Sequence, residues 1–262
     1  WVEINLDNLA HNIKQIRKIL RPGTRLMAVV KADAYGHGAK EVARLSLAEG
    51  CEWLGVALPE EGIELRRKGI DAPILVMGPV SLSSAPLYLH YNLTPTVYSW
   101  ELAQALSKEA SRKGSLLNVH VKIDTGMGRL GFPYFDSPEC VIERIANLPG
   151  LKVEGLYTHF SSADEPDSSF TLEQWQRFQN VLTSLKNKGI DIEIPHAANS
   201  GGILKYPQSQ AALVRLGISL YGYYPSHGLN SNTIVDLKPV LSLKSRLAFI
   251  KKVPAGFPVS YG

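Results

Sequence analysis

A lysine stands directly after a short apolar run near the start of the chain. In the stretch AVVKADAYGHG, residues 28–38, three small or branched apolar residues lead into Lys31, and an acid, a tyrosine, a histidine and glycines follow it. A lysine amine is nucleophilic only when it is uncharged, and apolar surroundings favour the uncharged form by lowering the pKa. A lysine at the end of a buried strand is therefore a candidate nucleophile, whereas the ordinary alternative is a solvated loop residue.

Polar side chains follow other apolar runs of the chain in the same way. With Lys31, the set comprises Asp124, Arg129, His159, Asn199 and Arg215. Each has an ordinary explanation by itself, such as a core histidine for His159 or a surface ion pair for Arg215. If the ends of these runs meet in the folded protein, however, the whole set converges on one rim, which is typical of an active site.

Three familiar kinds of site are not supported by the motifs. GMGRLG, residues 126–131, matches a dinucleotide-binding fingerprint, but Phe132 and Pro133 follow it in place of the helix that such a site requires. We therefore expect a conformationally demanding loop that presents Arg129. The histidines lack the spacing of zinc ligands, so no metal site is expected, and no GxSxG motif supports a nucleophilic serine.

Apolar runs that alternate with helical patterns must carry these polar groups. The runs read LMAVV, WLGVAL, PILVMG, TPTVYS, LNVHVKID, KVEGLYTHF, IEIPHAA and ALVRLGIS. Strands that alternate with helices indicate βαβ units and a parallel sheet. The eight runs favour an α/β fold of the (β/α)8 TIM-barrel type, in which catalytic groups lie at the carboxyl ends of the strands.

Both ends of the chain add to this pattern. Leu9, Ile13 and Ile16 recur at helical spacing, which predicts an amphipathic helix over residues 7–20. The stretch LKPVLSLKSRLAFIKKVPAGFPVSYG is strand-like, with proline and glycine turns. We expect a barrel over residues 1–230 and, over residues 231–262, a linker with the first strands of a β-rich C-terminal domain that this chain leaves incomplete.

Composition and charge exclude several classes of partner. The chain of 262 residues is 45% hydrophobic and 20% charged, and its net charge is +4. Its basic clusters are short, which does not predict nucleic-acid binding. No apolar run is long enough for a membrane span, and the two cysteines make no disulfide framework. We expect a cytoplasmic protein that binds neither nucleic acid nor membrane.

Several motifs, in the right order, resemble those of the alanine racemases, which bind pyridoxal 5'-phosphate on a (β/α)8 barrel followed by a β domain. AVVKADAYGHG resembles the motif of their cofactor lysine, and the likeness runs over the whole chain through WVEINLDNLAHNI, VKIDTGMGRLGF, GLYTHFSSAD, HAANSGG, VRLGISLYG and VSYG. The resemblance implies an isomerase that interconverts L- and D-alanine as a cytoplasmic homodimer. Its product would supply D-alanine for the peptidoglycan of the bacterial cell wall.

The resemblance also implies the catalytic residues. Lys31 would form an aldimine with the cofactor aldehyde and then act as one base. Racemisation removes a proton on one face of the α-carbon and delivers one on the other, so a second base is expected, and Tyr261 in VSYG matches the tyrosine of the family. In the family this tyrosine enters the partner's barrel across the dimer interface. Tyr261 would connect through His159 and Arg215 to the pyridine nitrogen.

Other residues match the family's contacts with the cofactor. Arg215 would face the pyridine nitrogen without giving up its proton, which would weaken the cofactor as an electron sink and suppress transamination. The phosphate contacts match Tyr35 and Ser200 and, through backbone N–H groups, Gly217 and Ile218. Asn199 and Ser200 precede a short predicted helix, whose N-terminus favours a phosphate group; Asn199 is counted with the cofactor contacts.

Two basic residues match positions near the substrate. Arg129 would bind the substrate carboxylate. Lys122, on the strand before it, matches a lysine that the family often carries as a carbamate, an anion that can position Arg129. The alternative for Lys122 is an ordinary ion pair with Asp124.

Other proteins with this barrel are alternatives. A pyridoxal-phosphate-binding homeostasis protein shares the barrel and the lysine but lacks the β domain and the opposing tyrosine, so VSYG argues against it. A decarboxylase of the same barrel class would place an acid where Arg215 stands. Within the racemases, a serine or broad-specificity enzyme stays open, because the size of the pocket depends partly on residues beyond position 262.

Overall fold

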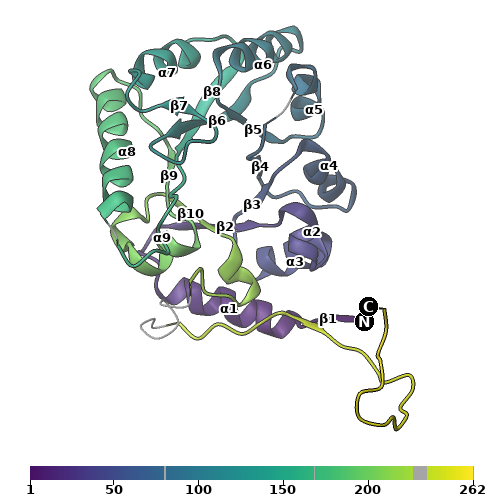
Figure 1. Cartoon of the computed structure of the whole chain (residues 1–262). Helices are drawn as coiled ribbons and strands as arrows, with labels where there is room; N and C mark the ends of the chain where they lie inside the picture. The colour runs from purple at the N-terminus through teal and green to yellow at the C-terminus, as the bar shows by residue number, and fades with distance from the viewer. Residues whose placement is uncertain (80, 168, 227–234, 262) are drawn as a thin grey trace.

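The computed structural model describes residues 1–79, 81–167, 169–226 and 235–261. In these residues, parallel strands form a barrel with helices around it (Figure 1). The barrel strands are β2 (Arg25–Val29), β3 (Trp53–Val56), β4 (Ile74–Val76), β5 (Thr94–Val97), β6 (Leu117–Asp124), β8 (Leu151–Tyr157), β9 (Ile194–His196) and β10 (Leu213–Leu216). The short strand β7 (Phe132–Pro133) adds to β6.

Pairing between neighbours closes the barrel. The order in the sheet is β10-β2-β3-β4-β5-β6-β8-β9. Backbone hydrogen bonds from Ala212 to Pro195, 3.1 Å, and from Arg215 to Ala198, 3.0 Å, join its two ends. The strands correspond to the apolar runs of the sequence, so the predicted (β/α)8 barrel is confirmed.

Helices cover the outside of the barrel (Figure 1). The first, α1 (Leu6–Lys18), agrees with the prediction over residues 7–20: Asn5 caps it by accepting from the Asn8 N–H at 2.9 Å, and its apolar face is buried. The others are α3 (Ala39–Ala48), α4 (Pro59–Arg67), α5 (Ala85–His90), α6 (Trp100–Arg112), α7 (Pro138–Ala146), α8 (Ser169–Asn187) and α9 (Ser200–Lys205), with 3-10 turns η1 (Leu82–Ser84), η2 (Pro207–Ser209) and η3 (Ile218–Tyr221). Among the described residues, no helix has the length and apolar character to cross a membrane.

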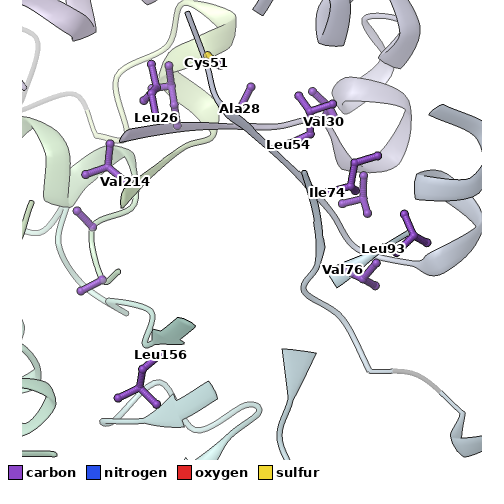
Figure 2. Packing of buried hydrophobic residues seen from close by; sticks show 14 of the residues in the cluster. Leu26, Ala28, Val30, Cys51, Leu54, Ile74, Val76, Leu93, Leu156 and Val214 are labelled. Carbon is purple, nitrogen blue, oxygen red and sulfur yellow. The ribbon is translucent and has the colours of Figure 1, made fainter. Parts of the chain in front are cut away.

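The apolar side chains form an outer and an inner layer, separated by the sheet. Leu26, Ala28 and Val30 lie in the outer layer between the strands and the helices (Figure 2). Met27, between two of them, belongs to the inner layer, which it shares with Trp53, Leu75, Tyr157, Ile194 and Leu213. The side chains of a strand alternate between its two faces. Strands β2, β3, β4, β8, β9 and β10 contribute apolar side chains to the inner layer.

Strand β6 carries polar side chains on its inner face. Val119, Val121 and Ile123 belong to the outer layer. His120 and Lys122 alternate with them and are buried at 0% and 4% exposure. Burial of groups that can carry charge costs free energy unless partners are supplied. The interior of the barrel must therefore provide partners for His120 and Lys122.

The two ends of the chain lie together beside α1 (Figure 1). There, β1 (Val2–Ile4) pairs antiparallel with β11 (Leu241–Leu243). In the described residues 235–261, β11 is the one regular strand, and several apolar side chains after it are exposed. The predicted domain boundary at residue 230 lies outside the described residues, so the β-rich domain over residues 231–262 stays a prediction.

Asn12 of α1 attaches the segment after residue 234 to the barrel. Its side-chain amide donates to the carbonyl oxygens of Leu220 and Lys238 at 3.1 and 2.9 Å and accepts the N–H of Lys238 at 2.8 Å. Asn12 is fully buried. Because buried backbone groups need partners, these bonds hold residues 235–240 against α1 and η3.

Candidate active site

A cavity of about 610 Å³ opens at the carboxyl ends of the barrel strands. The residues singled out in the sequence that line it are Lys31, Tyr35, Lys122, Arg129, His159, Asn199, Ser200, Arg215, Gly217 and Ile218. Asp124 ends β6 beside the cavity, whereas Tyr261 lies elsewhere. In the described residues, no group of His, Cys, Asp and Glu side chains is arranged to hold a metal ion. The strand ends thus bring the predicted polar groups, Tyr261 excepted, to one place.

Lys31 begins a left-handed turn. In α2 (Lys31–Gly36), the residues Ala32, Asp33, Ala34 and Tyr35 all have left-handed backbone angles, with φ of 52, 51, 54 and 54°. This conformation costs about 1–2 kcal/mol for each non-glycine residue, and it persists only where the surroundings impose it, commonly at functional sites. Lys31 is half-buried, less than predicted, and its Nζ lies 5.7 Å from the centre of the Tyr35 ring.

Arg215 on β10 holds a positive charge inside the barrel, at 2% exposure. Its Nη2 donates to the carbonyl oxygens of Thr158 and Ala197 at 2.7 and 2.9 Å and lies 3.3 Å from Nδ1 of His159. Its Nη1 donates to Nδ1 of His196 at 2.9 Å. The Nε–H has no acceptor among the described residues, and Arg215 lines the cavity. This N–H is therefore available to an acceptor in the cavity.

A chain of hydrogen bonds that was not predicted continues from Arg215 through the interior. Because Nδ1 of His196 accepts from Arg215, its Nε2 carries the proton and donates to Nδ1 of His120 at 2.9 Å. Nε2 of His120 then lies 3.4 Å from Oε2 of Glu154, at the outer limit of hydrogen bonding. The chain thus leads from a cation to a carboxylate. The one signal in the sequence was the alternation of valines with His120 and Lys122 on a single strand.

Burial and the charge of Arg215 keep the nearby histidines neutral. The pKa values of His159 and His196 lie well below the ordinary value, first because of burial and then because of Arg215. Burial lowers the pKa of Arg215 itself to about 10, so Arg215 stays protonated at neutral pH. His159 is then an uncharged neighbour of Arg215, and any proton network through it must use the neutral ring.

Asp124 organises the loop after β6. Its carboxylate accepts the backbone N–H groups of Gly126, Gly128 and Arg129 at 2.9, 3.1 and 3.2 Å. Gly131 has a φ of +120°, and a Cβ at this position would lie 2.8 Å from backbone atoms of β6. The structure therefore contains the predicted loop, whose backbone conformation requires glycine and which carries Arg129. It leads into β7 instead of a helix, in agreement with the rejection of a dinucleotide site.

Lys122 is buried close to other cations. Its Nζ donates to the carbonyl oxygen of Ile123 at 3.1 Å and lies 5.2 Å from the centre of the Tyr157 ring. Burial, together with the charge of Arg215, lowers the pKa of Lys122 to about 7. The carboxylate of Asp124 is engaged with the loop backbone, and these two described residues do not form the ion pair considered as the alternative.

Three residues expected at the phosphate surround one open place. A Cβ built on Gly217 would lie 3.8 Å from Oγ of Ser200 and 4.0 Å from Oη of Tyr35. Oγ of Ser200 also accepts the N–H of Gly217 at 3.1 Å. Asn199 caps α9 by accepting the N–H of Gly202 at 3.0 Å, which fixes Ser200 at the start of this helix. The missing side chain of Gly217 leaves room between two hydroxyl groups.

Tyr261 lies apart from these residues. Its side chain is fully exposed on the segment after β11, whose end lies beside the N-terminus (Figure 1). Within one chain, Tyr261 therefore does not complete the site.

Comparison with known proteins identifies the family. The family described as alanine racemase, N-terminal domain, matches residues 4–225. The chain belongs to the alanine racemase family. The alanine racemases of Carboxydothermus hydrogenoformans and Desulforamulus reducens are 48% and 45% identical over 262 residues, which are 100% of this chain and 70% of each relative. The solved structure of alanine racemase from Clostridium difficile 630 is similar with a TM-score of 0.94 at 40% identity, covering 100% of this chain and 68% of that chain.

Membership of the alanine racemase family confirms the resemblance inferred from the motifs. The (β/α)8 barrel described above has the same architecture as that structure over the whole of this chain. The chain spans about 70% of the length of the two racemases compared.

We expect buried Lys122 to make the stability of the protein depend on pH. Its pKa is about 7 in the folded chain against an ordinary 10.5, so between these values the unfolded chain binds a proton that the folded chain does not. The free energy of unfolding should therefore rise with pH in this range. Lys122→Met should remove roughly 2–4 kcal/mol of this rise, measured by urea denaturation in carbon-dioxide-free buffer. The control is Lys186→Met, at an exposed position; equal pH slopes for both variants would contradict the prediction.

Proposed function

We propose that this protein interconverts L- and D-alanine with pyridoxal 5'-phosphate as its cofactor, and so supplies D-alanine for the bacterial cell wall. The observation that carries the proposal is the arrangement of Lys31, Arg215 and Gly217 around one cavity in a chain of this family. Lys31 follows β2, and Arg215 and Gly217 lie on and just after β10, its neighbour in the barrel. These adjacent strands place an amine and a cation around the same cavity. They also leave an open cradle, the space beside Gly217 that Ser200 and Tyr35 border.

The cavity residues fit this cofactor. When bound, pyridoxal phosphate supplies an aldehyde and an electron-withdrawing ring, which make the α-proton of an amino acid removable. Lys31 offers an amine to the aldehyde, and Arg215 offers its Nε–H to the ring nitrogen. The phosphate would be held in the cradle by Tyr35, Ser200, Gly217 and Ile218, with Asn199 fixing the turn that carries Ser200.

Arg215 would also restrain the chemistry. With a pKa of about 10 it keeps its protons at neutral pH, so it would donate a hydrogen bond to the ring nitrogen without transferring a proton. Its bonds to the carbonyl groups of Thr158 and Ala197 and to His196 fix the guanidinium in place. By leaving the ring nitrogen unprotonated, Arg215 would limit the charge withdrawn from the α-carbon. This favours return of the proton to that carbon over transamination.

Two bases on opposite faces of the α-carbon would move the proton. The first is the amine of Lys31. The second is Tyr261 of another copy, because in its own chain Tyr261 is fully exposed. We therefore propose a cytoplasmic homodimer in which each chain contributes Tyr261 to the other's cavity, near Arg215 and His159. Support comes from the exposed apolar side chains of the same segment, which a dimer would cover: Leu247, Phe249, Ile250 and Val259.

Two further basic residues, Arg129 and Lys122, would serve the substrate. Arg129, on the loop fixed by Asp124, would bind the substrate carboxylate. With a pKa of about 7, the Lys122 amine is uncharged in much of the protein at neutral pH and can add to carbon dioxide. The N–C bond then forms, the amine loses a proton, and Lys122 becomes a carbamate anion. Such an anion would relieve the repulsion among Lys122, Arg129 and Arg215.

The proposal predicts racemisation of L-alanine. Decay of the circular dichroism of L-alanine, L-serine and L-lysine, each with added pyridoxal phosphate, measures the reaction. We expect the highest kcat/KM for L-alanine. Equal or faster turnover of L-serine would support the serine or broad-specificity alternative. Cofactor binding without turnover of any of the three would support the homeostasis protein.

Lys31 is expected to carry the cofactor. Borohydride reduction followed by peptide mass mapping should place the pyridoxyl group on Lys31. Lys31→Ala should lose this label and lower kcat about a thousandfold or more, since it removes the attachment and one base. Lys40→Ala, a nearby lysine outside the cavity, is the control and should keep both. A label on any other lysine of the wild-type chain would contradict the assignment.

Mixing of variants tests whether Tyr261 acts in another copy. Lys31→Ala and Tyr261→Phe should each be nearly inactive alone. In a mixed dimer, one site combines Lys31 from one chain with Tyr261 from the other, so mixing should restore part of the wild-type activity. Native mass spectrometry verifies that the chains exchange. Exchange without recovered activity would show that Tyr261 is not shared between chains.

A further inference from the structure

The left-handed turn after Lys31 is held by a carboxylate from the neighbouring unit of the barrel. Glu61 is the third residue of α4, the helix that follows β3. Its Oε1 accepts the backbone N–H of Ala32 at 2.6 Å. A short hydrogen bond to a charged acceptor is among the stronger ones in proteins. This bond therefore fixes the backbone directly after Lys31.

The other oxygen of Glu61 is anchored at the end of β3. Oε2 accepts the N–H groups of Ala57 and Leu58 at 2.7 and 3.0 Å. The bond to Leu58 is ordinary capping of α4 and occupies one oxygen. The bond to Ala32 lies outside this role. Glu61 thus links the end of β3 to the turn that Lys31 begins.

Other contacts hold the far end of the turn. Nδ1 of His37 lies 3.0 and 3.1 Å from the carbonyl oxygens of Ala34 and Tyr35. Among the described residues, the N–H of Ala32 donates to Glu61 alone. Because the left-handed conformation is unfavourable for alanine, the start of the turn needs support. The N–H of Ala34 donates to the carbonyl oxygen of Val30 at 2.9 Å, and Glu61 supplies the side-chain contact that holds the N–H of Ala32.

We propose that Glu61 is a positioning residue for Lys31: it holds Ala32 in the left-handed conformation and so aims the Lys31 amine into the cavity. The inference rests on the proposed role of Lys31 as the residue that carries the cofactor. Glu61 does not line the cavity. It therefore acts through the backbone instead of through contact with cofactor or substrate.

Hydrogen exchange of the cofactor-free protein tests whether Glu61 stabilises the turn. Glu61→Gln replaces one acceptor oxygen by an NH₂ group, which cannot accept. The matched control is Glu60→Gln, at the exposed position beside it. We expect amide exchange in residues 31–36 to be about tenfold faster in E61Q, the effect of one lost hydrogen bond to a charged group, and unchanged in E60Q. Exchange at the wild-type rate in E61Q would overturn the proposal.

Kinetics of the cofactor-loaded protein test the consequence for Lys31. At saturating pyridoxal phosphate, E61Q should lower kcat for L-alanine roughly ten- to a hundredfold through misplacement of the amine, with less pyridoxyl label trapped on Lys31 by borohydride. KM should change little, because Arg129 is unaffected. An equal fall of kcat in E60Q, or a change confined to KM, would overturn the proposal.

Rescue separates positioning from a general loss of structure. Glycine adopts the left-handed conformation without penalty, so Ala32→Gly in the E61Q chain should restore part of the lost kcat; no rescue would overturn the proposal. If E61Q does not fold, Glu61→Asp takes its place with the same readouts. Failure of the proposed function has a different signature: the wild-type label falls on another lysine, while E61Q still accelerates exchange in residues 31–36.

Discussion

The buried charge of Arg215 constrains the whole interior of the barrel. A guanidinium at 2% exposure is tolerated only where its N–H groups meet acceptors, and backbone carbonyl groups together with His196 supply them. The charge also acts on its neighbours: with burial, it lowers the pKa of His159, His196 and Lys122. Among the described residues, Arg215 therefore keeps its charge at neutral pH, whereas His159 and His196 are neutral and Lys122 is only partly protonated. The histidine pair connects Arg215 to His120, whose Nε2 lies 3.4 Å from Oε2 of Glu154.

The turn at Lys31 is a second constraint on the structure, because four successive non-glycine residues adopt left-handed backbone angles. Such a turn cannot be stable by itself. Glu61, from the helix after β3, holds its first residue, and His37, directly after the turn, lies within hydrogen-bond distance of its last carbonyl groups. The strain is thus supported by the same parallel strands that bring Lys31 next to Arg215. The position of the Lys31 amine therefore depends on the rigidity of the barrel.

Much of the fold could be predicted from the sequence. The apolar runs, the helical spacing of α1 and the glycines of the loop that presents Arg129 are local patterns, and local patterns determine strands, helices and turns. The positions of Lys31, Asn199 and Arg215 at strand ends followed from the barrel, because every strand of that fold ends at the same rim. The motifs also indicated the family, which the comparisons confirmed.

By itself, then, the sequence determined the order of the strands, the rim at which the polar groups gather and the family. Only the tertiary structure decided how those groups are held. Ala32 has no intrinsic preference for a left-handed angle, and a contact with Glu61, far along the chain, imposes it. His120 and His196 lie 76 positions apart and form a hydrogen bond only because the barrel closes. The pKa of Lys122 depends on burial that exists only in the folded chain. Long-range contacts and desolvation leave no periodic trace in a sequence, which is why these features appeared only in the structure.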